Sequence, residues 1–194
     1  MRKQVMTNLN MMIEAIKNKY ITHNKQDVLQ HVEDVARVAV SLAEIHGLDV
    51  EKIRLAALLH DVSCIMTPQE MYVFAKERNL TIDPAEEKYH ALLHQRISKI
   101  MAHEEFGITD PIILQAIECH TTLIKNASIY DKVIFIADKI SWDQKLSDLK
   151  ATATQSLDEA CYAYIQYQFD NDLLVMLHQW LLAAFEELKK DHTI

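Results

Sequence analysis

Apolar side chains recur along the chain at spacings of three and four residues, which is the period of a helix with one buried face. From Val32 to Ala43 they form a single stripe, which predicts an amphipathic helix that begins near Asp27 and ends near His46. The same pattern predicts a buried helix that ends around His60–Asp61 and further helices over residues 68–79, 84–105, 111–120, 129–145 and 156–189. We expect the last range to be a helical pair and residues 146–155 to be the loop before it.

The segment VIFIAD at 133–138 has the composition of a strand. Its helical neighbours and the lack of a strand partner favour a helix instead. The chain has only 2 Gly and 3 Pro, and so few turn formers argue against a fold with many strands. We therefore expect an all-α protein, a helical bundle with a C-terminal helical extension.

Local signals mark where several of these helices begin and end. Each proline follows a residue that caps helix N-termini well, and proline at the first helical position sacrifices no hydrogen bond. Two of the capping residues are followed three positions later by Glu, as in a capping box. Glycines follow two of the apolar stretches, as expected just past a helix C-terminus. These signals are Thr67-Pro68 with Glu70, Asp83-Pro84 with Glu86, Asp110-Pro111, Gly47 and Gly107.

The bulk composition is that of an ordinary globular protein. The 194 residues fit one domain over 1–194, with its chemistry within about 28–142 and C-terminal helices over about 156–189. A net charge of −8 argues against broad nucleic-acid binding, which needs a basic face. We find no membrane span and no signal-peptide h-region. The three cysteines are odd in number and widely spaced, so we expect reduced thiols and a cytoplasmic location.

The candidate chemistry begins with the pair His60–Asp61, which follows the apolar run LAALL and therefore lies at the buried end of a helix. A carboxylate is rarely buried there unless it is paired or binds a metal. For this pair alone, a protonated His stabilised by the helix dipole explains the pattern equally well.

Four more ionisable residues lie at the edges of apolar helices: His31, His94, His120 and Asp138. Each alone is better explained as a core or cap residue than as a ligand. Together with His60 and Asp61 they are explained by shared metal coordination, since neutral imidazole and carboxylate suit Fe, Mn, Zn or Ni. His90, four residues before His94, is the alternative ligand on that helix.

This pattern, H…HD…H…H…D, resembles the HD-domain phosphohydrolase superfamily, and within it the bacterial YqeK family. The similarity rests on HVEDVARVAVSLAEIHGLDVEKIRLAALLHD, LLHQRISKIMAHEEFGI, AIECHTT and DKVIFIADKI, within about 28–142. The resemblance implies an all-helical HD fold with two metal ions, usually iron, and Mn, Zn, Ni or Mg as alternatives. It further implies symmetrical hydrolysis of diadenosine tetraphosphate to two ADP, in a family once linked by prediction to NAD metabolism.

Carried over by position, the resemblance implies one metal held by His31, His60, Asp61 and Asp138. A second would be held by His94 and His120, with Asp61 bridging the two and assigned as the catalytic residue. A bridging hydroxide would be the nucleophile, because two metals can activate water and neutralise phosphoryl oxygens.

The chain also departs from that family around the substrate. It has Cys64 where relatives have Lys, Leu123 in HTTL where they have Gly, and KISWDQ where they have Glu-Pro and Arg. The missing Lys and Arg remove phosphate contacts. As substrate-binding residues we predict Thr121, Thr122 and Lys125, with Arg96, Lys132 and Lys139 as other candidate cations.

Other functions stay open at this stage. A nucleotide or deoxynucleotide phosphatase on the same scaffold would release inorganic phosphate, and a related two-iron scaffold supports an oxygenase reaction. A non-catalytic metal-binding sensor module is the non-enzymatic alternative. The partner expected in the leading case is a small nucleotide. Aromatic residues of the C-terminal region are best explained by packing, although with the Met residues they also suit a homodimer surface: Tyr162, Tyr164, Tyr167, Phe169, Trp180 and Phe185.

Overall fold

The computed structural model describes residues 2–142 and 147–190, and these form helices and connecting turns without a strand. The all-α prediction is therefore confirmed. The α-helices are α1 Arg2–Thr22, α2 Gln26–Ile45, α3 Val50–Leu59, α4 Pro68–Glu77, α5 Pro84–Lys88, α6 His94–Glu104, α7 Pro111–Glu118, α8 Ile129–Trp142, α9 Ser147–Gln155, α10 Leu157–Asp170 and α11 Gln179–Lys190, with 3₁₀ turns η1 Val62–Ile65 and η2 His90–Leu93.

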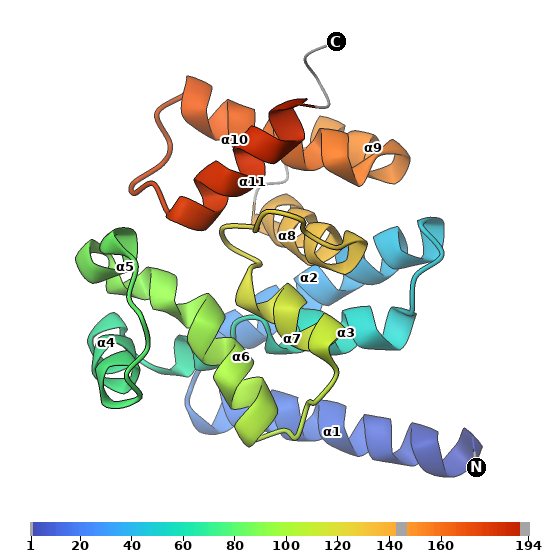
Figure 1. Cartoon of the computed structure of the whole chain (residues 1–194). Coiled ribbons are helices and arrows are strands. Elements are labelled where there is room, and N and C mark those ends of the chain that lie inside the picture. The colour runs from blue at the N-terminus through green and yellow to red at the C-terminus, as the bar shows by residue number, and fades with distance from the viewer. Residues whose placement is uncertain (1, 143–146, 191–194) are drawn as a thin grey trace.

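Helices α2, α3, α7 and α8 pack together in the middle of the molecule (Figure 1). Helix α1 crosses below them, and α9, α10 and α11 gather at the opposite end, against α8. Helices α4, α5 and α6 close one side. The buried apolar residues of these elements form one continuous core.

The segment VIFIAD is helical because it is buried on every side. Every residue from Val133 to Asp138 is buried within α8, so no polar face interrupts the apolar run. A helix buried all round loses the alternation that normally distinguishes it from a strand.

The expected helix ends are present. Thr67 and Asp83 form capping boxes with Glu70 and Glu86 at the starts of α4 and α5. Asp110 accepts the Ile112 N–H at the start of α7. Gly47 and Gly107 have φ of +67°, the left-handed conformation in which glycine ends helices at little steric cost.

Some predicted boundaries were wrong. Residues 84–105 are not one helix, because α5 ends at Lys88. The next residue, Tyr89, has φ −131° and ψ 82°, which are not helical angles, and it separates α5 from η2. Residues 147–155 form α9 rather than a loop, and the buried Leu149 and Ala153, four residues apart, hold it against its neighbours. The C-terminal range is the expected helical pair, interrupted at 171–178. The predicted end of α8 at 143–145 lies outside the described residues.

The sequence pattern also did not identify α1, although Ile16 and Tyr20 of this helix are fully buried. The Tyr20 hydroxyl donates a hydrogen bond to the Leu58 carbonyl at 2.9 Å, which ties α1 to α3. None of the described helices is long and apolar enough to cross a membrane.

Candidate metal centre

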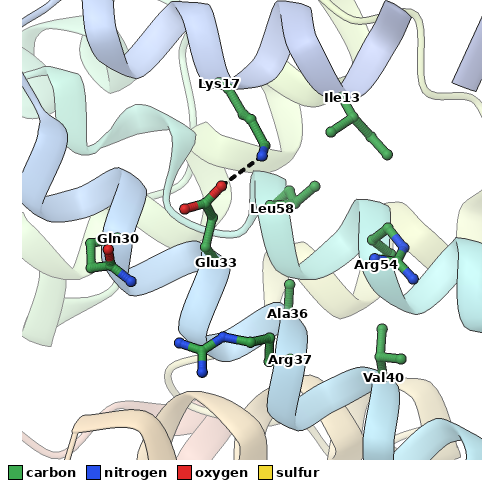
Figure 2. Close-up of a pocket in the computed structure, with 9 residues that line it drawn as sticks. All are labelled: Ile13, Lys17, Gln30, Glu33, Ala36, Arg37, Val40, Arg54 and Leu58. Atoms are coloured by element: carbon green, nitrogen blue, oxygen red, sulfur yellow. Dashed lines mark ion pairs between the residues drawn. The ribbon is translucent and has the colours of Figure 1, made fainter. Parts of the chain in front are cut away.

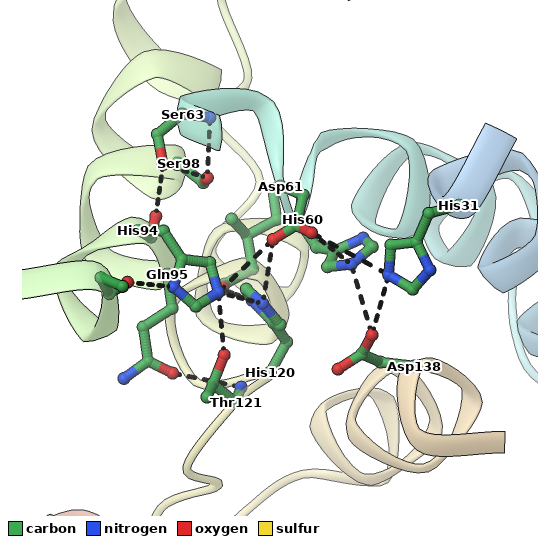
Figure 3. Close-up of polar contacts among 12 residues, drawn as sticks. His31, His60, Asp61, Ser63, His94, Gln95, Ser98, His120, Thr121 and Asp138 are labelled. Carbon is green, nitrogen blue, oxygen red and sulfur yellow. Dashed lines mark hydrogen bonds and ion pairs between the residues drawn. The ribbon is translucent and has the colours of Figure 1, made fainter. Parts of the chain in front are cut away.

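Six side chains that are far apart in the sequence meet at the centre of the helical core (Figure 3). Helices α2 and α8 contribute one side chain each, as do the start of α6 and the turn after α7. The two residues that follow α3 contribute the other two. Each therefore lies on or beside a helix whose packing fixes its position. In chain order they are His31, His60, Asp61, His94, His120 and Asp138.

Asp61 lies between the histidines, and each of its carboxylate oxygens faces two imidazoles. Its Oδ1 is 3.4 Å from Nε2 of His94 and 3.4 Å from Nε2 of His120. Its Oδ2 is 3.6 Å from Nε2 of His60 and 3.9 Å from Nε2 of His31. A carboxylate placed in this way is able to bridge two cations, one on each oxygen.

Asp138 closes the other side of the cluster. Its Oδ1 is 3.0 Å from Nε2 of His31 and 3.7 Å from Nε2 of His60. Its Oδ2 accepts a hydrogen bond from the Lys139 ammonium at 2.8 Å. One oxygen of Asp138 therefore faces the histidines, while the other is held by a cation of the same helix.

Backbone carbonyls fix the orientation of three of the rings. His60, His94 and His120 each place Nδ1 against the carbonyl oxygen three residues earlier, at 2.6, 2.6 and 2.9 Å. A carbonyl only accepts, so Nδ1 carries the hydrogen and the neutral ring has its lone pair on Nε2. This is the support that metal-binding histidines commonly receive.

The electrostatics of His60 and His120 differ because their neighbours differ. Burial lowers the pKa of His60, but the carboxylates of Asp61 and Asp138 outweigh it and raise the pKa to about 9. Burial also lowers the pKa of His120, where Asp61 opposes the fall and the nearby His60 and His94 add to it, so that it reaches about 4. Burial raises the pKa of Asp61, yet its histidine neighbours hold that pKa well below the ordinary value.

Unsatisfied atoms show that the donor set fits metal ions. Among the described residues, Nε2 of His60 and Oδ1 of Asp61 are buried without a hydrogen-bond partner. The donor atoms of His31, His60 and Asp61 lie within 4.8 Å of one another, and so do those of Asp61, His94 and His120. Two groups of N and O donors that share one carboxylate suit a pair of divalent cations.

Gln95 is a supporting residue that the sequence analysis missed. Its side chain is fully buried, and Oε1 accepts the backbone N–H of Thr121 at 3.1 Å and of Thr122 at 3.3 Å. This holds the turn beyond His120 next to α6. The adjacent Thr121 hydroxyl lies 3.0 Å from Nε2 of His94. A buried polar residue beside a candidate ligand was the available signal.

The predicted substrate-binding residues and the alternative ligand His90 lie in different places relative to the cluster. Thr121 lines the cavity beside the cluster, Thr122 is buried against Gln95, and Lys125 is exposed and lies outside the described cavity lining. His90 stacks on Tyr72 with ring centroids 4.0 Å apart and belongs to neither donor group.

Of the other candidate cations, Lys139 lines the cavity. Arg96 and Lys132 instead pair with Glu86 and Asp158. Cys64 also lines the cavity, but burial and Asp61 raise the pKa of its thiol, so it stays protonated and is unsuited to thiolate ligation.

The cavity beside the cluster measures about 640 Å³, a size typical of small-molecule sites. Asp61, His94, His120 and Asp138 form its polar floor. A second cavity of about 490 Å³ lies between α1, α2 and α3 (Figure 2). It contains the Lys17–Glu33 ion pair at 2.7 Å and holds none of the predicted site residues. The candidate metal ligands therefore lie beside the first cavity and not beside the second.

Comparison with known proteins agrees with this geometry. The family model described as HD domain matches residues 28–143, which is more than half of the chain and includes all six side chains. The chain belongs to the HD-domain family. As an HD-domain phosphohydrolase it is an enzyme of the class that the sequence pattern predicted.

Three relatives illustrate the similarity. A protein of Lactococcus lactis subsp. cremoris, named only by its position in the pepC 5' region, is 36% identical over 140 residues, covering 70% of this chain and 71% of its own. A protein of Halalkalibacterium halodurans named symmetrical bis(5'-nucleosyl)-tetraphosphatase is 32% identical over 136 residues, covering 69% and 71%. A crystal structure from Clostridium acetobutylicum, described as a predicted HD superfamily hydrolase involved in NAD metabolism, has a TM-score of 0.84, 27% identity and coverage of 92% and 97%.

The C-terminal helices α9, α10 and α11 lie beyond the HD match, yet α10 and the segment that follows it contribute to the cavity. Tyr164, Tyr167 and Leu173 from this part of the chain line it together with the HD residues. The extension therefore forms part of the wall around the site.

Proposed function

We propose that this HD-domain phosphohydrolase cleaves dinucleoside polyphosphates, and that its substrate is diadenosine tetraphosphate, which it splits symmetrically into two ADP. The observation that carries the proposal is the shared Asp61, whose two oxygens each face a separate group of imidazoles. The relative named as a symmetrical tetraphosphatase supports the choice of substrate.

We assign one metal to His31, His60, Asp61 and Asp138, and a second to His94, His120 and the bridging Asp61. Iron is the proposed metal, with Mn, Zn, Ni and Mg as alternatives. When bound, two such ions supply an activated water and neutralise charge on phosphoryl oxygens. Asp61 is the catalytic residue in this assignment because it is a ligand of both metal ions and so fixes their positions relative to each other.

The protein's own groups position the phosphates. The Thr121 hydroxyl lies at the cavity wall and is able to donate to a phosphoryl oxygen. Lys139 brings a positive charge to the same wall, where an acidic protein otherwise repels a polyphosphate. Thr122 acts through Gln95 to hold the turn. Lys125, exposed beyond this turn, stays a proposed contact for the outer part of the substrate.

Metal content and reaction products test this function together. Protein purified without chelator should contain two metal ions per chain by elemental analysis and should convert diadenosine tetraphosphate to ADP alone. The test variant is Asp61→Asn, which keeps the shape of the side chain but removes the charge of the carboxylate proposed to bridge the two metal ions. This variant should lose activity. Formation of ATP and AMP, or release of inorganic phosphate from nucleoside monophosphates, would contradict the proposal, and the second result would favour a nucleotide phosphatase.

Two further proposals concern the setting of the enzyme. The three cysteines are free, which supports a reducing cytoplasmic location. A homodimer is proposed through exposed apolar side chains of the 171–178 segment that lie outside the cavity lining, Val175 and Leu177. Light scattering measures the mass that decides this.

A further inference from the structure

Exposed aromatic side chains gather at a single place on this protein. The described residues include every Phe, Tyr and Trp of the chain, and three of these are exposed: Tyr89 at 48%, Trp142 at 70% and Tyr167 at 49%. All three line the cavity that holds the metal ligands. We call these three residues the aromatic rim.

The rim is assembled from separate parts of the chain. Tyr89 lies in the break between α5 and η2, Trp142 ends α8, and Tyr167 belongs to α10, beyond the HD match. Packing holds Trp142 in place, because its ring lies on that of His31 with centroids 4.4 Å apart at 33°. The remainder of the indole is open, as its exposure shows.

The rim and the metal ligands give the cavity lining two chemically different sets of side chains. The ligands, Thr121 and Lys139 are polar and suit phosphate. The rim, with Leu173 at 51% exposure beside it, offers large apolar faces that water solvates poorly. A ligand that contacts both sets must combine an anionic chain with a flat, weakly polar group. A nucleotide has both.

We propose that the aromatic rim is the nucleobase-binding site of this enzyme, on which a purine base stacks while its phosphates reach the metal centre. Aromatic faces bind bases with little dependence on sequence because every base has a π-face. This inference rests on the proposed function only in using the same cavity for the phosphates, and it holds for any nucleotide that enters. It also gives the C-terminal extension a role in binding substrate.

Binding of two probes isolates the contribution of the base. The metal-loaded protein is titrated by calorimetry with ADP and with inorganic pyrophosphate, which share a diphosphate but differ in the nucleoside. We expect ADP to bind at least about 10-fold more tightly, since one stacked base contributes about that much or more. Tyr167→Ala should remove most of this preference while leaving the dissociation constant for pyrophosphate within about twofold.

Two controls separate stacking from a structural effect. Tyr167→Phe keeps the ring and should retain the preference for ADP. Leu182→Ala removes an apolar side chain, 42% exposed, from α11 of the same extension and away from the cavity, and it should behave as the wild type. Equal affinity of the wild type for both probes, or equal weakening of both in Tyr167→Ala, would overturn the inference. If Tyr167→Ala instead changes the mass measured by light scattering and leaves the affinities for ADP and pyrophosphate unchanged, the inference is also overturned, and Tyr167 is then a contact with a second copy of the chain.

The outcomes are independent of the test of function. A protein that prefers ADP through Tyr167 but does not hydrolyse diadenosine tetraphosphate keeps the inference and loses the proposed function. Hydrolysis to two ADP without any preference for ADP over pyrophosphate keeps the function and overturns the inference.

Discussion

His94 and His120 point their Nε2 atoms at each other, 2.9 Å apart, and at the same oxygen of Asp61. The Nδ1 hydrogens of both rings are used by backbone carbonyls, so two lone pairs and a carboxylate oxygen converge on one point. Only a proton or a cation relieves the repulsion in such a group.

The first prediction concerns this half of the site. His94→Ala should retain the metal bound by the other group and lose the second one, with a fall in kcat of more than about 100-fold, because loss of even an indirect support costs 10–100-fold. Metal analysis and steady-state kinetics measure both effects. The exposed His23→Ala serves as the matched control. Full metal occupancy with an unchanged rate in His94→Ala would reject the two-metal assignment.

The second prediction separates positioning from stability. Gln95→Ala leaves the backbone N–H groups of Thr121 and Thr122 without their partner, which costs about 1–3 kcal/mol for the buried N–H of Thr122 and less for the part-buried one of Thr121. Because the turn carries His120, metal affinity should fall as well, by about 10-fold. Gln115→Ala removes the hydrogen bond from its amide to Asp131, 2.6 Å long and away from the cavity. This control should lose stability but keep metal affinity, and equal metal affinity in both variants would contradict the role of Gln95.

The third prediction is a pH dependence of the metal-free protein. The folded-state pKa of His60 is about 9, above the ordinary 6.5, so the folded protein binds a proton that the unfolded chain releases. This stabilisation is fully present below pH 6.5 and is lost as the pH rises toward 9. Between pH 6.5 and 8 the free energy of unfolding should fall by up to about 2 kcal/mol. Urea unfolding of chelator-treated protein measures this fall.

Metal-loaded protein is the control for that experiment, since a bound cation replaces the proton on His60. Its stability should change little over the same interval. A metal-free protein that is equally stable at both pH values would show that His60 is not protonated between Asp61 and Asp138.

The fourth prediction compares two lysines. Lys139→Met removes the cation that lines the cavity and pairs with Asp138, and it should raise KM for the tetraphosphate by about 10-fold, in line with the loss of a charge-assisted hydrogen bond. Lys125→Ala, at an exposed position, should raise KM by less. Because Lys139 also holds Asp138, metal content is measured in parallel. A larger effect for Lys125 would place the polyphosphate outside the cavity.

The helices that the sequence predicted well have an apolar stripe and a marked end. Helix α2 was expected over 27–46 and spans 26–45, and α4 begins at its capping proline. The break at Tyr89 was not predictable, because neither Gly nor Pro marks it and only tertiary packing selects its backbone angles. In α9 the buried Leu149 and Ala153 are too few to form a recognisable stripe.

The candidate site was predictable in a similar way. An ionisable residue at the edge of an apolar helix is visible in the sequence, and the resemblance to the HD pattern singled out six of them, which lie together in the structure; their role as metal ligands stays a prediction. Gln95 and the aromatic rim were not identified from the sequence, since nothing local distinguishes Tyr167 from the packing aromatics around it. Tyr167 was expected among those packing residues, but it is 49% exposed, because the face of α10 that carries it borders the cavity rather than the core.

Helix α8 carries both Asp138 and Trp142, four residues apart. That separation corresponds to a rise of about 6 Å along the helix, which is buried from Val133 to Asp138. Inserting a single residue between them would rotate the indole by about 100° away from its place beside His31. The spacing between Asp138 and the proposed platform for the base is therefore set by the register of one helix, which an insertion or deletion would change and a substitution would keep.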